Sequence, residues 1–273
     1  DYVAPSYGTT SDDNPLYTLN VIAHRQFRIG PRQIDASVID AKLLRQLQEA
    51  DGVMANVATG YHAVEFLLWG QDLHGTKPGA GERPASDYNL KACTHGNCDR
   101  RAAYLKAATD LLVDDLGTMA ADWAPGGKAR KELSAKAADG GLATILTGIG
   151  SLSYGELAGE RMKLGLSLHD PEEEQDCFSD NTHNEHYGDE FGMTEIWRGH
   201  YTRLDGTVVQ GASLRDFAAA KNPAAAKRLD DAMNDALAKV KRSKERGDSG
   251  CRAYDQIIAA GNLEANKFVQ DAI

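Results

Sequence analysis

Apolar residues recur along most of the chain at three- and four-residue spacings, which is the period of an amphipathic helix. No segment sustains the alternation of a strand, although residues 207–210 hint at one, and residues 1–33 are expected to be irregular. The pattern therefore predicts an all-α protein built of antiparallel helices in bundles. Helices are expected at 35–49, 55–69, 97–123, 128–139, 142–166, 182–201, 213–221, 223–246 and 250–270.

The stretch 55–72 places an ionisable pair inside an otherwise apolar helix. His62 and Glu65 lie three residues apart and therefore share one helical face, where both can bind one ion. The simpler alternative is a hydrogen bond between the two side chains that satisfies both in the core, and spacing alone favours it. Tyr61 and Trp69 are expected to pack in the core.

A second group of ligand-type side chains lies at 180–186, with the sequence Asp-Asn-Thr-His-Asn-Glu-His. Its two histidines would stand one turn apart on a helix that starts near Thr182. The alternative is a solvated helix start, in which Asp180 and Thr182 cap the helix and Glu185 interacts with the helix dipole.

The composition of the 273-residue chain is ordinary for a globular protein, with 42% hydrophobic and 26% charged residues. Acidic residues outnumber basic ones by 40 to 30, and the net charge of −10 repels phosphate backbones, so nucleic acid is not an expected partner. No apolar run approaches the roughly 20 residues that span a bilayer. The sequence signatures of a zincin, a di-iron bundle, a c-type haem and an α/β-hydrolase serine are absent.

The four cysteines suggest disulfides. The short loop between Cys93 and Cys98 makes these two the natural local pair, which leaves Cys177 to reach Cys251. The alternative is four free thiols in a cytosolic protein. The chain begins at Asp1 without Met or a signal-peptide pattern, so it is expected to be a processed or trimmed product.

Three motifs lie far apart in the sequence. The run GYHAVEFLLWGQD contains a Gly-x-His-x-x-Glu core at Gly60, His62 and Glu65. The run ASDYNL follows a Gly/Pro loop, and Glu-Arg-Met around Arg161 is followed by CFSDNTH, which ends at His183. Together these motifs closely resemble the imelysin-like family of bacterial envelope proteins, and the resemblance covers most of the chain.

The resemblance implies a particular division of the chain. Two antiparallel helical-bundle halves are expected, residues 1–125 with the Gly-x-His-x-x-Glu motif and residues 126–273 with Asp-Asn-Thr-His. The resemblance also places His62 and Glu65 in the family's signature, which reverses the preference for a simple hydrogen bond. We expect the two motifs to meet in one polar pocket between the halves.

That pocket is expected to hold a metal ion. Arg161 is expected to hold the ligand carboxylates in place without binding the ion itself, and its alternative role is a surface ion pair with Glu160 or Asp170. The expected ligands are His62, Glu65, Asp180 and His183, with Arg161, Asn181 and Thr182 supporting them.

The resemblance implies a periplasmic or outer-membrane-associated protein that binds a metal ion and takes part in iron uptake without catalysis. Iron, zinc and calcium are the candidate ions, and an iron-containing ligand and envelope iron-uptake proteins are the expected partners. The alternative is a metal-dependent peptidase that uses His62 and Glu65. Peptide hydrolysis needs an activated water, an open coordination position and a base, and the sequence offers ligands without a separate base. Binding is therefore favoured, and a scaffold with an inert polar core is a third alternative.

Overall fold

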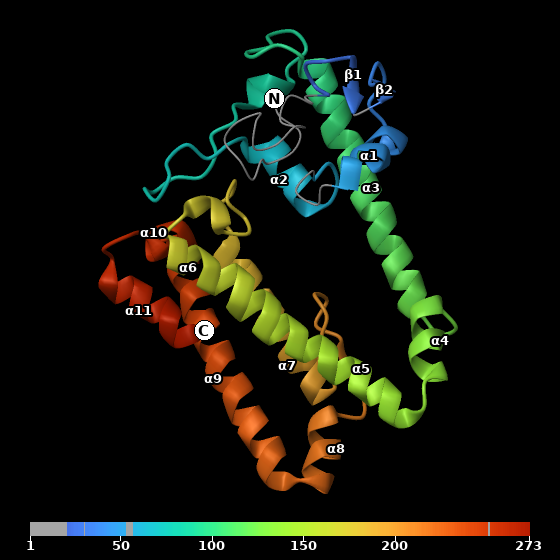
Figure 1. Ribbon diagram of the computed structural model, residues 1–273, viewed down its shortest axis with the longest axis vertical. Helices are drawn as coiled ribbons and strands as arrows, with labels where there is room; N and C mark the ends of the chain where they lie inside the picture. Colours follow the sequence, from blue (N-terminus) through green and yellow to red (C-terminus); the bar gives the residue numbers. More distant parts are fainter. Residues whose placement is uncertain (1–20, 30, 53–56, 251) are drawn as a thin grey trace. The chain divides into compact units, whose positions relative to one another are not determined.

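The computed structural model describes residues 21–29, 31–52, 57–250 and 252–273 (Figure 1). Its helices and two small hairpins confirm the all-α prediction. The chain divides into two compact units. The first contains the described residues up to Leu73 together with Ala80–Lys136, and the second contains His74–Gly79 and Ala137–Ile273. No described helix is long and apolar enough to cross a bilayer.

The first unit combines a β-hairpin with helices of very different lengths. The hairpin pairs Gln26 with Asp35 and Ile29 with Arg32, where the sequence predicted irregular chain. Each strand has four residues, which is too short for a recognisable alternation. The elements are β1 (Gln26–Ile29), β2 (Arg32–Asp35), α1 (Ala41–Leu47), η1 (Ala50–Gly52), α2 (Tyr61–Trp69), η2 (Ala85–Tyr88), α3 (Cys98–Trp123) and α4 (Lys128–Ala135).

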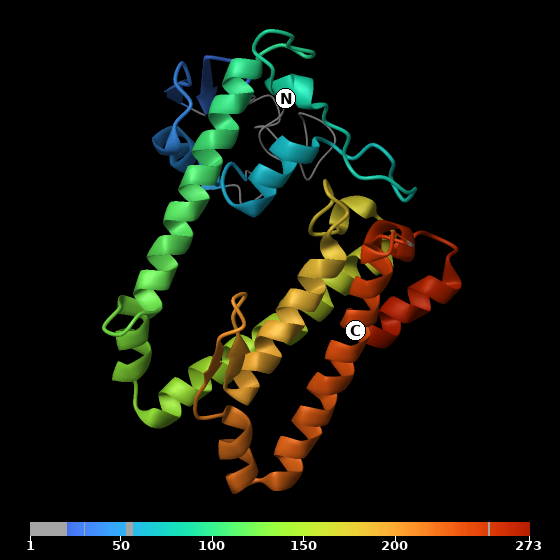
Figure 2. The same ribbon diagram turned by 180° about the vertical axis from the view of Figure 1, so that it is seen from behind.

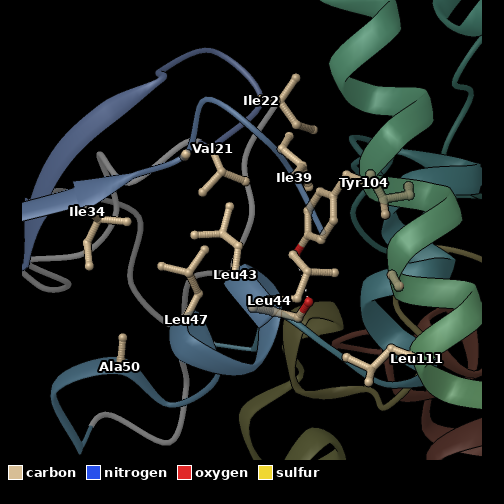
Figure 3. Packing of buried hydrophobic residues seen from close by; sticks show 14 of the residues in the cluster. Val21, Ile22, Ile34, Ile39, Leu43, Leu44, Leu47, Ala50, Tyr104 and Leu111 are labelled. Atoms are coloured by element: carbon tan, nitrogen blue, oxygen red, sulfur yellow. Dashed lines mark hydrogen bonds between the residues drawn. The ribbon is translucent and has the colours of Figure 1, made fainter. Parts of the chain in front are cut away.

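The hydrophobic core of this unit lies between the hairpin, α1 and the first half of α3 (Figure 3). Ile34 from the hairpin and Leu44 from α1 are fully buried there. Tyr104 of α3 enters the same core, and its hydroxyl donates a hydrogen bond of 2.8 Å to the carbonyl oxygen of Ala58. Burial raises the pKa of Tyr104, so this phenol remains a neutral donor.

A buried arginine ties the hairpin segment to α3. The Nε of Arg100 donates to the carbonyl oxygen of Ile22 at 2.9 Å, and its Nη2 donates to that of Ala36 at 2.7 Å. The same guanidinium also donates to the carbonyls of Val21 and Ser37. The planar guanidinium thus satisfies backbone carbonyl groups in the segments that precede and follow the hairpin, which no apolar side chain can do.

The second unit is a bundle in which α7 lies beside both the long helix that begins with α5 and the helix α9 (Figures 1 and 2). Its core gathers Met193 and Trp197 from α7, Met233 from α9 and Ile257 from α10. The elements are α5 (Ala138–Gly150), η3 (Ser151–Leu164), α6 (Gly165–Leu168), η4 (Pro171–Glu173), α7 (Thr182–Arg198), β3 (His200–Thr202), β4 (Val208–Gln210), α8 (Leu214–Lys221), α9 (Pro223–Asp248), α10 (Tyr254–Ile258) and α11 (Leu263–Ala272).

Two helices of this unit differ from the predicted ones. The helix expected at 142–166 is continuous, but its middle part, η3, has the wider hydrogen bonding of a π-helix. Such helices are rare in proteins, and those that occur often lie at functional sites. The helix expected at 250–270 is divided into α10 and α11, because Gly261 between them has a φ of 80°.

The predicted disulfide between Cys93 and Cys98 is confirmed. It closes the short loop that leads into α3. The predicted partner of Cys177 is Cys251, which lies outside the described residues, so that pairing stays a prediction.

Replacing Arg100 by Met should destabilise the first unit, because Met keeps the length of the side chain but leaves several buried carbonyl oxygens without a donor. We expect a loss of roughly 3 kcal/mol in the free energy of unfolding, measured by urea denaturation. Arg130→Met, at an exposed position of α4, is the matched control. Equal losses in the two variants would contradict the anchoring role.

Candidate functional site

The helix α2 carries the His62 and Glu65 pair. The Nδ1 of His62 lies 3.1 Å from an Oε of Glu65, so the hydrogen bond that spacing favoured is present. Glu65 is buried, whereas His62 is about one-third exposed. The helix is shorter than predicted, because Gly60, with a φ of 88°, directly precedes its first turn.

The prediction that Tyr61 and Trp69 pack in the core is wrong. Their exposed fractions are 61% and 40%. The buried face of α2 is formed instead by Ala63, Phe66 and Leu67, so these two aromatic side chains fall on other faces of the short helix.

The C-terminal end of α2 is held by the loop that follows it. A Cβ on Gly81 would lie 2.6 Å from the carbonyl oxygens of Trp69 and Gly70, so only glycine permits this close return of the chain. The backbone N–H of Arg83 donates to the carbonyl oxygen of Trp69 at 2.8 Å. The Arg83 guanidinium lies over the ring of Phe66 and pairs with buried Asp87 at 3.2 Å. The ASDYNL motif, which contains Asp87, therefore supports the helix that carries His62.

The start of α7 is fixed by side-chain hydrogen bonds. The Oγ1 of Thr182 accepts the backbone N–H of Asp176 at 2.9 Å, and Thr182 is fully buried. The Oδ1 of Asn181 accepts from the side chain of Asn184 at 2.8 Å. Asn181 and Thr182 thus hold the turn that presents His183.

His183 is oriented by the end of α9. Its Nε2 lies 3.2 Å from the Oδ1 of Asp248, which can only accept, and 3.1 Å from the side-chain nitrogen of Asn184, which can only donate, so either tautomer of the ring has a partner at Nε2. Gly247 makes room for the ring, since a Cβ there would lie 2.4 Å from its atoms. The Nδ1 of His183 is buried and has no hydrogen-bond partner among the described residues. In the tautomer that donates from Nε2 to Asp248, this nitrogen presents a lone pair, as a metal-binding imidazole does.

Three carboxylates meet close to this turn. One oxygen from each of Glu174, Asp180 and Asp255 lies within 4.8 Å of the others, and Glu174 and Asp255 are buried. Asp180 reaches the group from a left-handed backbone conformation, with a φ of 55°. Carboxylates this close repel one another, and burial adds to the cost, so a proton or a positive charge is needed to compensate.

Sequence reasoning found Asp180 but missed Glu174 and Asp255. Glu174 ends an acidic run that reads as a solvated turn, so nothing in the sequence distinguishes it from Glu172 and Glu173. Asp255 offered a signal, because it is the single charged residue of the short helix α10, which ends in two isoleucines.

Arg161 lies on η3, and its Nη2 pairs with Glu156 at 3.3 Å. Neither Glu160 nor Asp170 is its ion-pair partner in the described part of the chain.

His186 is only 1% exposed and stands edge-on to the ring of Tyr254, with ring centres 4.8 Å apart. Burial, followed by the positive charge of Arg161, lowers the pKa of His186 to about 3, so this imidazole is neutral at physiological pH.

The structure therefore brings Asp180 together with two unexpected carboxylates, and it buries the Nδ1 of His183 without a hydrogen-bond partner among the described residues. The expectation that His62 and Glu65 join them in one pocket stays a prediction.

The family model that matches this chain, Imelysin (peptidase family M75), covers residues 12–273. The chain belongs to the imelysin family. No curated protein matches it. The resemblance of the Gly-x-His-x-x-Glu and Asp-Asn-Thr-His motifs is thus confirmed at the level of the family, and the carboxylates of Glu174 and Asp255 are features of this imelysin that its motifs did not indicate.

A further acid lies deeper along α7. Glu190 is only 4% exposed, and its Oε1 accepts a long hydrogen bond of 3.5 Å from the Oγ1 of Thr194. Burial raises the pKa of Glu190 from 4.5 to about 7, and the Thr194 hydrogen bond opposes this only in part.

Replacing Glu190 by Gln should stabilise the protein at pH 8 and have little effect at pH 4. Between pH 4.5 and about 7 the unfolded chain releases this proton while the folded chain retains it, so stability falls as the pH rises through this window and then levels off. The gain at pH 8 should be on the order of 2 kcal/mol in the free energy of unfolding. Urea denaturation at both pH values measures it, and a gain independent of pH would contradict the burial of an ionised Glu190.

Proposed function

We propose that this imelysin binds a metal ion through the carboxylates of Glu174, Asp180 and Asp255 and that it serves iron uptake in the bacterial cell envelope without catalysis. The observation that carries the proposal is the meeting of three carboxylate oxygens within 4.8 Å, two of them from buried side chains. A bound cation would compensate the mutual repulsion of these groups.

The donor set constrains the ion. Carboxylate oxygens suit hard cations such as calcium, and imidazole nitrogen suits iron and zinc. Glu174, Asp180 and Asp255 would hold the ion. No imidazole nitrogen belongs to this group of three oxygens, so a contribution from a histidine, which would favour iron or zinc over calcium, is tested by the choice of ions below.

The envelope location is supported by the Cys93–Cys98 disulfide, because such bonds persist in oxidising compartments. The net charge of −10 is compatible with attraction of cations and unfavourable for nucleic acid.

The second candidate function is a metal-dependent peptidase, which the family's name suggests. It would use His62 and Glu65. Glu65 would have to serve as a metal ligand or as the base, and one of its carboxylate oxygens is already occupied by the hydrogen bond with His62. Binding therefore remains the favoured function.

Metal binding can be tested by isothermal titration of the chelator-stripped protein with calcium, zinc and ferric ions. We expect binding of at least one ion, weakened at least about tenfold by Asp255→Asn and by Glu174→Gln. Asp271→Asn removes a carboxylate from a surface pair with Lys267 and is the matched control. Thermal unfolding without metal verifies that the variants fold, and wild-type protein that binds none of the three ions would refute the proposal.

The same protein, loaded with each ion, should leave an unstructured fluorogenic peptide intact. Metal-dependent cleavage that Glu65→Ala abolishes would replace the proposal by the peptidase. Loss of metal binding in His62→Ala would show that the first unit contributes to the ion's site.

A further inference from the structure

The second unit contains a pocket of about 350 Å³ that is distinct from the carboxylate group. Its walls come from α5, η3, α7, α9 and α11. The volume falls within the range typical of small-molecule sites. Much of the lining is apolar, and Ile149, Met193, Leu229 and Met233 contribute to it.

The pocket has an acid in its wall. Glu190 lines it and is itself almost completely buried. Among the described residues, no basic side chain pairs with this carboxylate, and its hydrogen bond from Thr194 is at the long limit of 3.5 Å. Because the negative charge of this buried carboxylate is so weakly compensated, a positively charged ligand in the adjoining pocket would be favoured.

The other charged residues of the pocket do not offer that compensation. Lys239 pairs with Asp235 on the same helix at 2.9 Å. Asp271 pairs with Lys267 at 2.6 Å. The one lysine in the lining is thus already matched by a carboxylate, and the acids of the lining disfavour an anionic ligand.

We propose that this pocket binds a small organic cation with an apolar body, of the alkylammonium class, with Glu190 as its counter-charge. The ammonium group would pair with the Glu190 carboxylate, and the alkyl chain would contact the methionine and aliphatic side chains. Methionine suits this role, because its flexible thioether adapts to ligands of different shape. Because Asp235 and Asp271 are each paired with a lysine, the lining leaves only the Glu190 carboxylate for an occupant, whereas a metal ion requires several oxygen or nitrogen donors.

This site is independent of the proposed metal site. Glu190 follows His183 by seven residues on α7, a rise of about 10 Å along the helix axis. A failure to bind metal would therefore not contradict this inference, and a failure to bind an organic cation would not contradict the proposed metal site.

The test compares three probes of equal chain length, n-pentylammonium, n-pentanol and pentanoate, by isothermal titration at pH 8, where Glu190 is ionised. We expect n-pentylammonium to bind wild-type protein with a Kd on the order of 1 mM, and pentanoate not to bind. Glu190→Gln should weaken the binding of n-pentylammonium at least about tenfold and leave that of n-pentanol unchanged. Gln retains an acceptor for Thr194, so the variant should fold.

Two further variants complete the test. Ala236→Phe fills the pocket and should abolish binding of all probes. Glu195→Gln removes another buried acid from α7, outside this pocket, and should bind n-pentylammonium as the wild type does. Binding of n-pentylammonium that Glu190→Gln leaves unchanged, or an absence of binding to wild-type protein, would overturn the proposal.

Discussion

The cost of burying polar side chains on α7 is the constraint on which the second unit depends. One face of this helix carries Thr182, His183, His186, Glu190 and Thr194 into the interior, against η3 and α9. Apolar residues at these positions would pack without penalty, whereas each polar group needs a partner or must remain neutral. The cost of burying each polar side chain is offset in a different way along the helix, so successive turns of α7 differ in charge and in hydrogen bonding.

At its first turn, Thr182 receives a backbone N–H and His183 is held by Asp248. One turn later, His186 has no such partner for its Nε2 among the described residues and is neutral instead. Further on, the described part of the chain gives Glu190 only the weak hydrogen bond from Thr194, and Glu190 borders a pocket. The helix thus passes from a turn beside the three carboxylates, through a neutral segment, to the pocket that Glu190 lines.

The sequence predicts those features that depend on local spacing. The apolar period identified the helices, the short interval between Cys93 and Cys98 identified the disulfide, and the Asp-Asn-Thr-His run identified the start of α7. Features that depend on distant segments could not be predicted. Arg100 reaches carbonyl groups more than sixty residues earlier in the chain, and Asp255 joins Asp180 from another helix. Within the sequence alone, an arginine in an amphipathic helix is expected to be a surface residue.

The contact between α9 and His183 shows why a local motif becomes a site only in its tertiary setting. Within the motif, either nitrogen of the imidazole can carry the proton. Asp248 places an acceptor 3.2 Å from Nε2, and Gly247 allows the ring to approach α9 closely enough for that contact. Lys244 pairs with the same carboxylate and, with the Asn184 side chain, lowers the pKa of Asp248, so that this acceptor stays ionised. The last two turns of α9 therefore determine the orientation of the His183 ring, with Nε2 beside Asp248 and Nδ1 buried, and the motif alone contains none of this information.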